Sequence, residues 1–344
     1  MKKQLIAAAV ATSVSAIAMA DVSITGNANY EYFAKEDTTN FKTNYADTEI
    51  NLSVKGKSGD TSVVANFEID NHGDATSALD IEDTYIQTKV GDFTVKAGNY
   101  ASGTSALGGE IDQGGRATDK VDVSTMLGDI KVGYAVSAVS STDENLNTDG
   151  AAVYASIPVA GWTVGLKDNS DSYTIMGATG SVGGFDIRVE NKDNDSSTVG
   201  DALFYDIRTK VGDVTVGYAA IDADKAGTGA TTDAVTEGDS SVFAQEMATD
   251  ATSAGKTGVD GVSQVMASTT VDGTTFTVKV GELRGGVVSG TQYQDASFSR
   301  IDAKRKLASG ATLVVSYDDY ESTVAAGSVI TDTQVFEIDL SIAF

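Results

Sequence analysis

The chain has 344 residues, with a single proline, 36 glycines, no cysteine and a formal net charge of −25. The lack of cysteine excludes disulfides, thiol chemistry and cysteine-based metal sites. The acidic balance argues against nucleic acid as a partner and against an interior built to attract anions. Few prolines and many glycines are typical of a chain made almost wholly of paired strands, because proline cannot donate to a strand ladder.

The first predicted element is a cleavable signal peptide over residues 1–20. A short positive segment precedes a mostly apolar stretch, and Ala18-Met19-Ala20 is the small-x-small pattern that signal peptidase cuts. An N-terminal membrane anchor is the alternative, but the apolar stretch is short and interrupted by polar residues. We therefore expect an exported chain that begins at Asp21, with residues 21–344 as one domain.

After the N-terminus no stretch approaches the roughly 20 apolar residues that a membrane-spanning helix needs. The mean hydropathy is −0.09, close to that of a water-soluble protein. A strand of a membrane barrel needs only one apolar face, so this value is compatible with strands that cross a bilayer.

Short Gly/Asp turns recur along the chain between segments of alternating polarity. Val90-Gly91-Asp92-Phe93 returns as Leu127-Gly128-Asp129-Ile130 and again as Val211-Gly212-Asp213-Val214. Glycine beside aspartate or glycine supplies the positive φ angles of short hairpins. Looser copies are Lys57–Asp60, Pro158–Gly161, Val182–Gly184, Val271–Gly273 and Ala308–Gly310.

The remaining connections are longer and polar, and they alternate strictly with the tight turns. Outer-membrane barrels have this asymmetry, with short turns on the periplasmic rim and longer loops outside. Eight tight turns, nine longer connections and a strand at each end predict an all-β, transmembrane antiparallel barrel of 16–18 strands, with 18 by direct count. The longer connections cover roughly residues 34–44, 70–80, 100–118, 141–149, 168–171, 191–200, 222–260, 285–293 and 319–331.

The phase of the apolar residues predicts which side of each strand meets lipid. Apolar and charged residues alternate without exception over Phe185–Glu190, and the last strand alternates in the same way up to Phe344. Because Arg or Lys at mid-membrane costs about 2–4 kcal/mol, the apolar side must face lipid and the charged side a wet interior. A soluble sheet would instead need a second apolar layer. The segment Ile81–Val90 shows neither phase cleanly.

Two other sequence features bear on function. The single histidine, His72, lies in a polar connection without an arranged nucleophile or acid-base partner, so we expect no enzyme activity. Aromatic residues at strand ends are predicted to form interfacial girdles rather than a ligand site. They are Tyr30, Tyr32, Tyr100, Tyr134, Trp162 and Tyr218.

The terminal Phe344, the opening Asp21–Gly26, the Gly-Asp hairpins and the long connection after the fifth strand together resemble those of Gram-negative general porins. The resemblance covers residues 21–344 and implies an outer-membrane location. It also implies a homotrimer, contact with outer-membrane lipid and lipopolysaccharide, and recognition of Phe344 by the barrel-assembly machinery. Members are usually 16-stranded barrels, so the count of 18 is a departure.

In that family the third loop folds into the lumen, and its acidic residues face a basic cluster on the wall. The matching connection here is 100–118, which implies Glu110, Asp112 and Arg116 as constriction residues, although the family's fuller acidic motif is missing. A field between loop and wall would orient water and dipolar solutes. Strand phase places these basic residues on the lumen wall: Lys96, Lys131, Arg188, Arg208, Arg300 and Lys304. The alternative is that they are ordinary solvated wall residues.

The outer connections are acidic, which predicts weak cation selectivity because an acidic mouth raises the local cation concentration. The same acids could bind Ca²⁺ loosely, bridging to lipopolysaccharide phosphates. No segment has the spacing of a dedicated calcium loop, so we expect no metal site and no cofactor.

The sequence favours a porin for passive diffusion of small hydrophilic solutes and ions. The alternative is a substrate-selective channel of sugar or amino-acid type, which 18 strands would favour. Such a channel should carry a row of lumen aromatics, and strand phase assigns few to the interior, Phe204 among them. A third possibility is a structural or adhesive barrel whose 222–260 connection binds a partner.

Overall fold

The computed structural model describes ten stretches of the chain, and the signal peptide predicted over 1–20 lies outside them. The described residues are 21–37, 42–70, 78–101, 116–137, 151–170, 173–195, 201–223, 256–288, 291–324 and 329–344. No helix suited to crossing a membrane occurs in these stretches.

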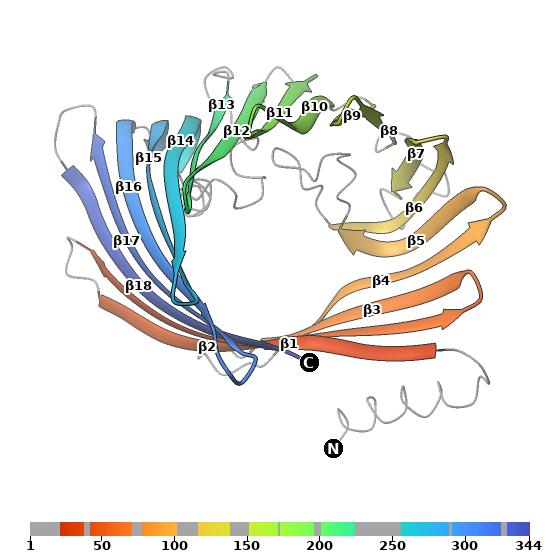
Figure 1. The fold of residues 1–344 in the computed structure, drawn as a ribbon, viewed down its shortest axis with the longest axis horizontal. Helices are drawn as coiled ribbons and strands as arrows, with labels where there is room; N and C mark the ends of the chain where they lie inside the picture. Colours follow the sequence, from red (N-terminus) through yellow and green to blue (C-terminus); the bar gives the residue numbers. More distant parts are fainter. Residues whose placement is uncertain are drawn as a thin grey trace.

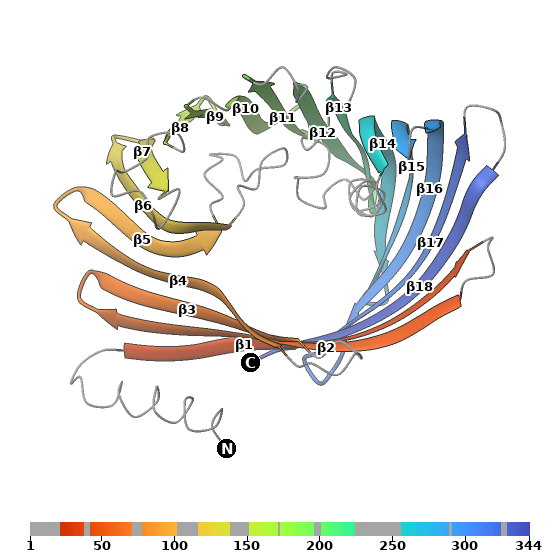
Figure 2. The same cartoon turned by 180° about the vertical axis from the view of Figure 1, so that it is seen from behind.

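The described residues form a closed, antiparallel 18-strand barrel (Figures 1 and 2). Each strand pairs with the next in the chain, and β1 pairs with β18 to close the ring. This confirms the predicted fold class and the direct count of 18. The strands are β1 (Asp21–Asp37), β2 (Lys42–Ser58), β3 (Thr61–Asp70), β4 (Ala78–Val90), β5 (Phe93–Ala101), β6 (Arg116–Leu127), β7 (Ile130–Ser137), β8 (Ala152–Val159), β9 (Trp162–Asn169), β10 (Tyr173–Val182), β11 (Phe185–Asn194), β12 (Ala202–Val211), β13 (Val214–Ala223), β14 (Lys256–Val271), β15 (Thr274–Val288), β16 (Thr291–Lys306), β17 (Thr312–Val324) and β18 (Val329–Ala343).

All eight predicted tight turns join neighbouring strands at the expected positions. Two of them place a residue other than glycine at positive φ: Ala160 has φ 50° and Asp272 has φ 49°. A glycine at φ 88° or 78° follows each of them. Two successive positive φ values match the right-handed twist of the flanking strands, which is why such pairs close two-residue hairpins.

The seam of the ring joins the two ends of the barrel domain. Gly26 and Phe344 exchange two backbone hydrogen bonds of 2.9 Å each, in register with the β1–β18 ladder. A Cβ at Gly26 would lie only 2.9 Å from the terminal phenyl ring. The missing side chain therefore provides the space in which Phe344 lies against β1.

The two faces of the sheet differ as the residue phase predicts. Large apolar side chains such as Val63, Ile86 and Leu340 are exposed on the outer face, with Val63 at 50%. Acidic, basic and amide side chains alternate with them and lie on the inner face. A ring that is apolar outside and ionic inside has no dry core, and barrels of about this size enclose water.

The ambiguous segment Ile81–Val90 contains a β-bulge. The pairing between β3 and β4 shifts from Ala65–Thr84 to Phe67–Ile81, so β4 has one residue more than its partner. The outward positions are therefore odd-numbered before the bulge and even-numbered after it. A single alternating phase cannot describe such a strand.

Candidate functional site

Lysines held against aromatic rings characterise the inner wall from β4 to β12. The ammonium of Lys96 on β5 lies 3.9 Å from the ring centroid of Tyr85 and 3.7 Å from that of Tyr100. The two rings meet edge to face at 5.6 Å, and Tyr100 is 3% exposed. A cation between two ring faces is attracted by both quadrupoles. Tyr100 is thus an inward residue, and its assignment to an outer girdle was wrong.

Tyr154 on β8 connects three strands of the same wall. Its hydroxyl donates to both carboxylate oxygens of Asp122 at 2.9 and 3.0 Å. The ammonium of Lys131, a predicted wall residue, lies 5.5 Å from its ring centroid. The ring lies across Gly133, where a Cβ would overlap it. Lys131 therefore projects beside a tyrosine that is held in place by Asp122.

Further along this wall, Tyr173 lies between two buried lysines. Lys167 donates a 2.7 Å hydrogen bond to the Tyr173 hydroxyl, and the ammonium of Lys192 lies 4.5 Å from the ring centroid. Both lysines are 4% exposed. Strand phase alone would have found them, since each alternates with outward residues on its strand.

The predicted residues Arg188 and Arg208 each pair with an acid on the same strand face. Arg188 donates to Glu190 at 2.7 Å and also lies 5.7 Å from the ring centroid of Phe204. Arg208 donates to both oxygens of Asp206 at 2.9 and 2.5 Å. These arginines are fixed by their partners and do not project as isolated charges.

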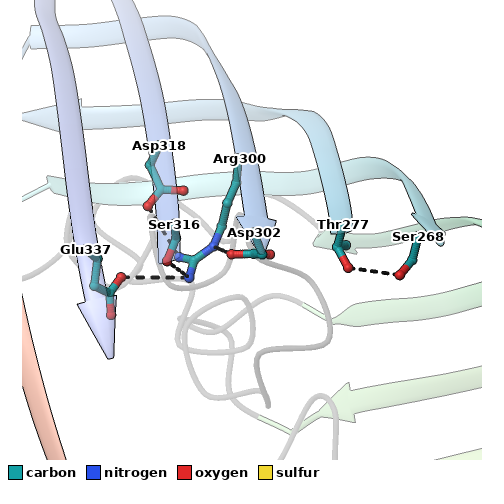
Figure 3. A network of polar contacts seen from close by, with 7 residues as sticks. All are labelled: Ser268, Thr277, Arg300, Asp302, Ser316, Asp318 and Glu337. Carbon is teal, nitrogen blue, oxygen red and sulfur yellow. Dashed lines mark hydrogen bonds and ion pairs between the residues drawn. The ribbon is translucent and has the colours of Figure 1, made fainter. Parts of the chain in front are cut away.

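The opposite wall, from β16 through β18 to β1, is acidic. Arg300 forms ion pairs with Asp302 at 2.5 Å, Asp318 at 3.4 Å and Glu337 at 3.8 Å (Figure 3). It also donates to the hydroxyl of Ser316 at 3.1 Å. One guanidinium thus serves three carboxylates from three strands.

Two further acids extend this cluster around the seam. Glu31 on β1 and Asp339 on β18 lie beside Glu337. One carboxylate oxygen of each residue lies within 4.8 Å of one carboxylate oxygen of both others. Between the two walls, β14 and β15 present hydroxyls, among them Ser268 and Thr277 at 3.0 Å (Figure 3).

The charged walls face each other across the barrel. The lysine-rich wall is centred near β8 and the acidic wall near β17, which are half of the 18-strand ring apart. Charges of opposite sign on facing walls would set up an electric field across the lumen.

The other predicted site residues are placed as follows. Lys304 lies on β16 in phase with Arg300 and is exposed. Arg116 begins β6 and pairs through its backbone with Ala101. Glu110 and Asp112 lie outside the described residues, so their predicted role at a constriction stays a prediction.

The sequence interpretation, which assigned few aromatic residues to the interior, missed several of them. Beyond Phe204 and the tyrosines described above, Phe298 and Tyr320 are buried and lie in phase with inward residues of β16 and β17. The sequence signal was available. Phe298 is three residues from the outward Ile301, and Tyr320 is three residues from the outward Tyr317. An odd separation along a strand places two residues on opposite faces.

Comparison with solved structures identifies the fold. Pseudomonas aeruginosa OccK2 (OpdF), solved in complex with glucuronate, superimposes with a TM-score of 0.62 at 10% identity over 94% of this chain and 98% of its own. Pseudomonas aeruginosa OccK11 (OpdR) gives 0.62 at 11% identity over 94% and 96%. Acinetobacter baumannii OccAB3 gives 0.57 at 10% identity over 94% and 100%.

The fold is that of outer-membrane porins. No protein-family model matches the sequence, and no curated protein matches it either.

Proposed function

We propose that this chain is an outer-membrane porin that forms a water-filled channel for passive diffusion of small hydrophilic solutes and ions. The observation that carries the proposal is the closed 18-strand ring with exposed apolar side chains outside and ionic side chains inside. Water in the interior hydrates those charges, and a hydrated path through a membrane conducts.

Liposome swelling with sugars of graded size tests this function. Swelling rates that fall steadily with solute size support a diffusion pore. No flux of any solute, with the protein folded in the liposomes, would leave only a structural or adhesive barrel.

We also propose weak cation selectivity. The formal charge of −25 and the acidic wall around Arg300 favour cations, whereas the lysine-rich wall opposes them. A reversal potential measured across a planar bilayer in a KCl gradient tests this, and a preference for chloride would refute it.

Substrate selectivity is the second candidate function. It is favoured by inward aromatics beside lysines, which offer both a ring face and a charge to a solute. Because OccK2 was solved with glucuronate, sugar acids are the first solutes to compare with neutral sugars of equal size. Equal swelling rates for glucose and glucuronate would exclude a preference for sugar acids.

The resemblance to general porins extends the proposal to assembly and export. We propose a homotrimer in contact with lipopolysaccharide, cleavage before Asp21, and recognition of Phe344 by the barrel-assembly machinery. Channel closure in three equal steps tests the trimer, and N-terminal sequencing of the membrane-extracted protein tests the cleavage site.

A further inference from the structure

The β-bulge in β4 helps to form a recess in the lumen wall. The recess has a volume of about 830 Å³ and is lined by residues of β1 to β4 and the C-terminus. Strict alternation would turn one of two consecutive residues toward lipid. The extra residue in β4 lets both Glu82 and Asp83 line the same recess. Bulges of this kind re-aim side chains and are frequent beside functional sites.

Amides and carboxylates dominate the polar lining. Asn27 pairs with Asn51 across β1 and β2, and Asn51 pairs in turn with Glu68 on β3. Asn66 donates a 3.1 Å hydrogen bond to Asp83. These groups form a continuous row of donors and acceptors at mid-strand, on the face opposite the exposed Val63.

The charge of the recess is negative. Three carboxylates line it, those of Glu68, Glu82 and Asp83, and the described lining residues include no lysine or arginine. Lys96 on β5 interacts electrostatically with Asp83, but its ammonium is held between the rings of Tyr85 on β4 and Tyr100 on β5. The balance therefore favours a cationic ligand.

We propose that this recess binds a small hydroxylated solute that carries a protonated amine, of the amino-sugar class. An ammonium supplies three donors to carboxylates, and sugar hydroxyls both donate to and accept from amides. The volume lies within the roughly 300–1,000 Å³ of small-molecule sites. This inference rests on the proposed channel function, since the solute reaches the recess from the lumen.

The test uses the purified full chain in a planar bilayer. Conductance in KCl is recorded first, then glucosamine is added at mildly acidic pH, where its amine is protonated. We expect brief current blocks whose frequency rises with concentration. N-acetylglucosamine, which has the hydroxyls without the charge, should block far less, and equal block by the two sugars would overturn the proposal.

Variants separate the recess from the general field of the lumen. E82Q/D83N should weaken glucosamine block about tenfold, the loss expected for charge-assisted bonds worth about 1.4 kcal/mol. The matched control D302N/D318N removes two carboxylates of the acidic wall that do not line the recess, and should change the reversal potential while leaving the block intact. If both pairs reduce the block equally, the recess is not the site.

Two further outcomes are distinguishable. A channel that conducts without any glucosamine block refutes the recess and leaves the proposed function standing. A protein that does not conduct refutes the proposed function, and calorimetry of the detergent-solubilised chain with glucosamine then decides the recess. If E82Q/D83N fails to insert, Asn51→Ala, which removes an amide without changing charge, should weaken the block several-fold, and an unchanged block would count against the site.

Discussion

The two charged walls of the barrel stabilise their cations in different ways. From β4 to β12, lysines such as Lys96 lie against tyrosine rings. From β16 to β1, Arg300 lies among carboxylates of three strands. A ring attracts a cation without adding charge, whereas a carboxylate cancels it. The lysines that lie against rings therefore keep their positive charge, whereas Arg300 is outnumbered by its three carboxylates and the cluster around it is net negative.

The largest expected effect follows from removing the guanidinium of the acidic wall. Arg300→Ala leaves the carboxylates of Asp302, Asp318 and Glu337 without this partner, and should cost about 2–4 kcal/mol of unfolding free energy. Urea unfolding in detergent micelles measures the loss. Cation preference should rise at the same time, because a positive charge has been lost.

Arg300→Lys is the matched variant, since it keeps the charge but not the planar fork. It should lose less stability and leave the reversal potential near that of the unchanged protein. An Arg300→Ala protein as stable as its parent would contradict the assigned role of Arg300.

The next effect concerns packing in the lysine-rich wall. Gly133→Ala places a methyl group where the ring of Tyr154 lies, and should cost about 1–3 kcal/mol. Gly56→Ala is the control, because a Cβ there meets nothing within 4 Å. Equal losses in the two variants would mean that the Tyr154 ring does not require Gly133.

A smaller effect measures the ring contact itself. A double-mutant cycle of Lys96→Met and Tyr100→Leu should give a coupling of about 0.5–2 kcal/mol, as expected for a partly desolvated cation on a ring face. Urea unfolding of the four proteins gives the value. Strictly additive losses would show that the two side chains are neighbours without a stabilising contact.

The smallest effect is on selectivity. Neutralising the acidic wall with D302N/D318N should lower the cation-to-anion permeability ratio about twofold, and Lys131→Gln on the other wall should raise it slightly. Both shifts should shrink in about 1 M salt, where the Debye length falls to about 3 Å. A ratio that is unaffected at low salt would show that the walls do not determine selectivity.

Much of the fold was predictable because its causes are local in the sequence. Turn chemistry at positions such as Gly91-Asp92 gave the hairpins, and alternation placed Arg188 and Arg300 in the interior. The bulge at Glu82-Asp83 could not be predicted, since no residue type marks it and only the broken phase of Ile81–Val90 indicated an irregularity.

Side-chain contacts between strands could not be predicted from the sequence for a different reason. Tyr154 donates to Asp122 two strands away, and such contacts depend on the register between strands, which phase does not determine. The assignment of Tyr100 to a girdle failed because position at a strand end says nothing about which face a ring occupies. Glu110 and Asp112 stay predictions.

Only one strand pairing of this ring is not between neighbours in the chain. Every other ladder joins strands that follow each other, whereas the pair Gly26 and Phe344 brings the first strand to the last residue. Linking ends this far apart costs about 5 kcal/mol of chain entropy by the logarithmic loop rule. Each hairpin forms from residues that are close in the sequence, whereas closing the circle must bring Gly26 and Phe344 together across the whole length of the sheet.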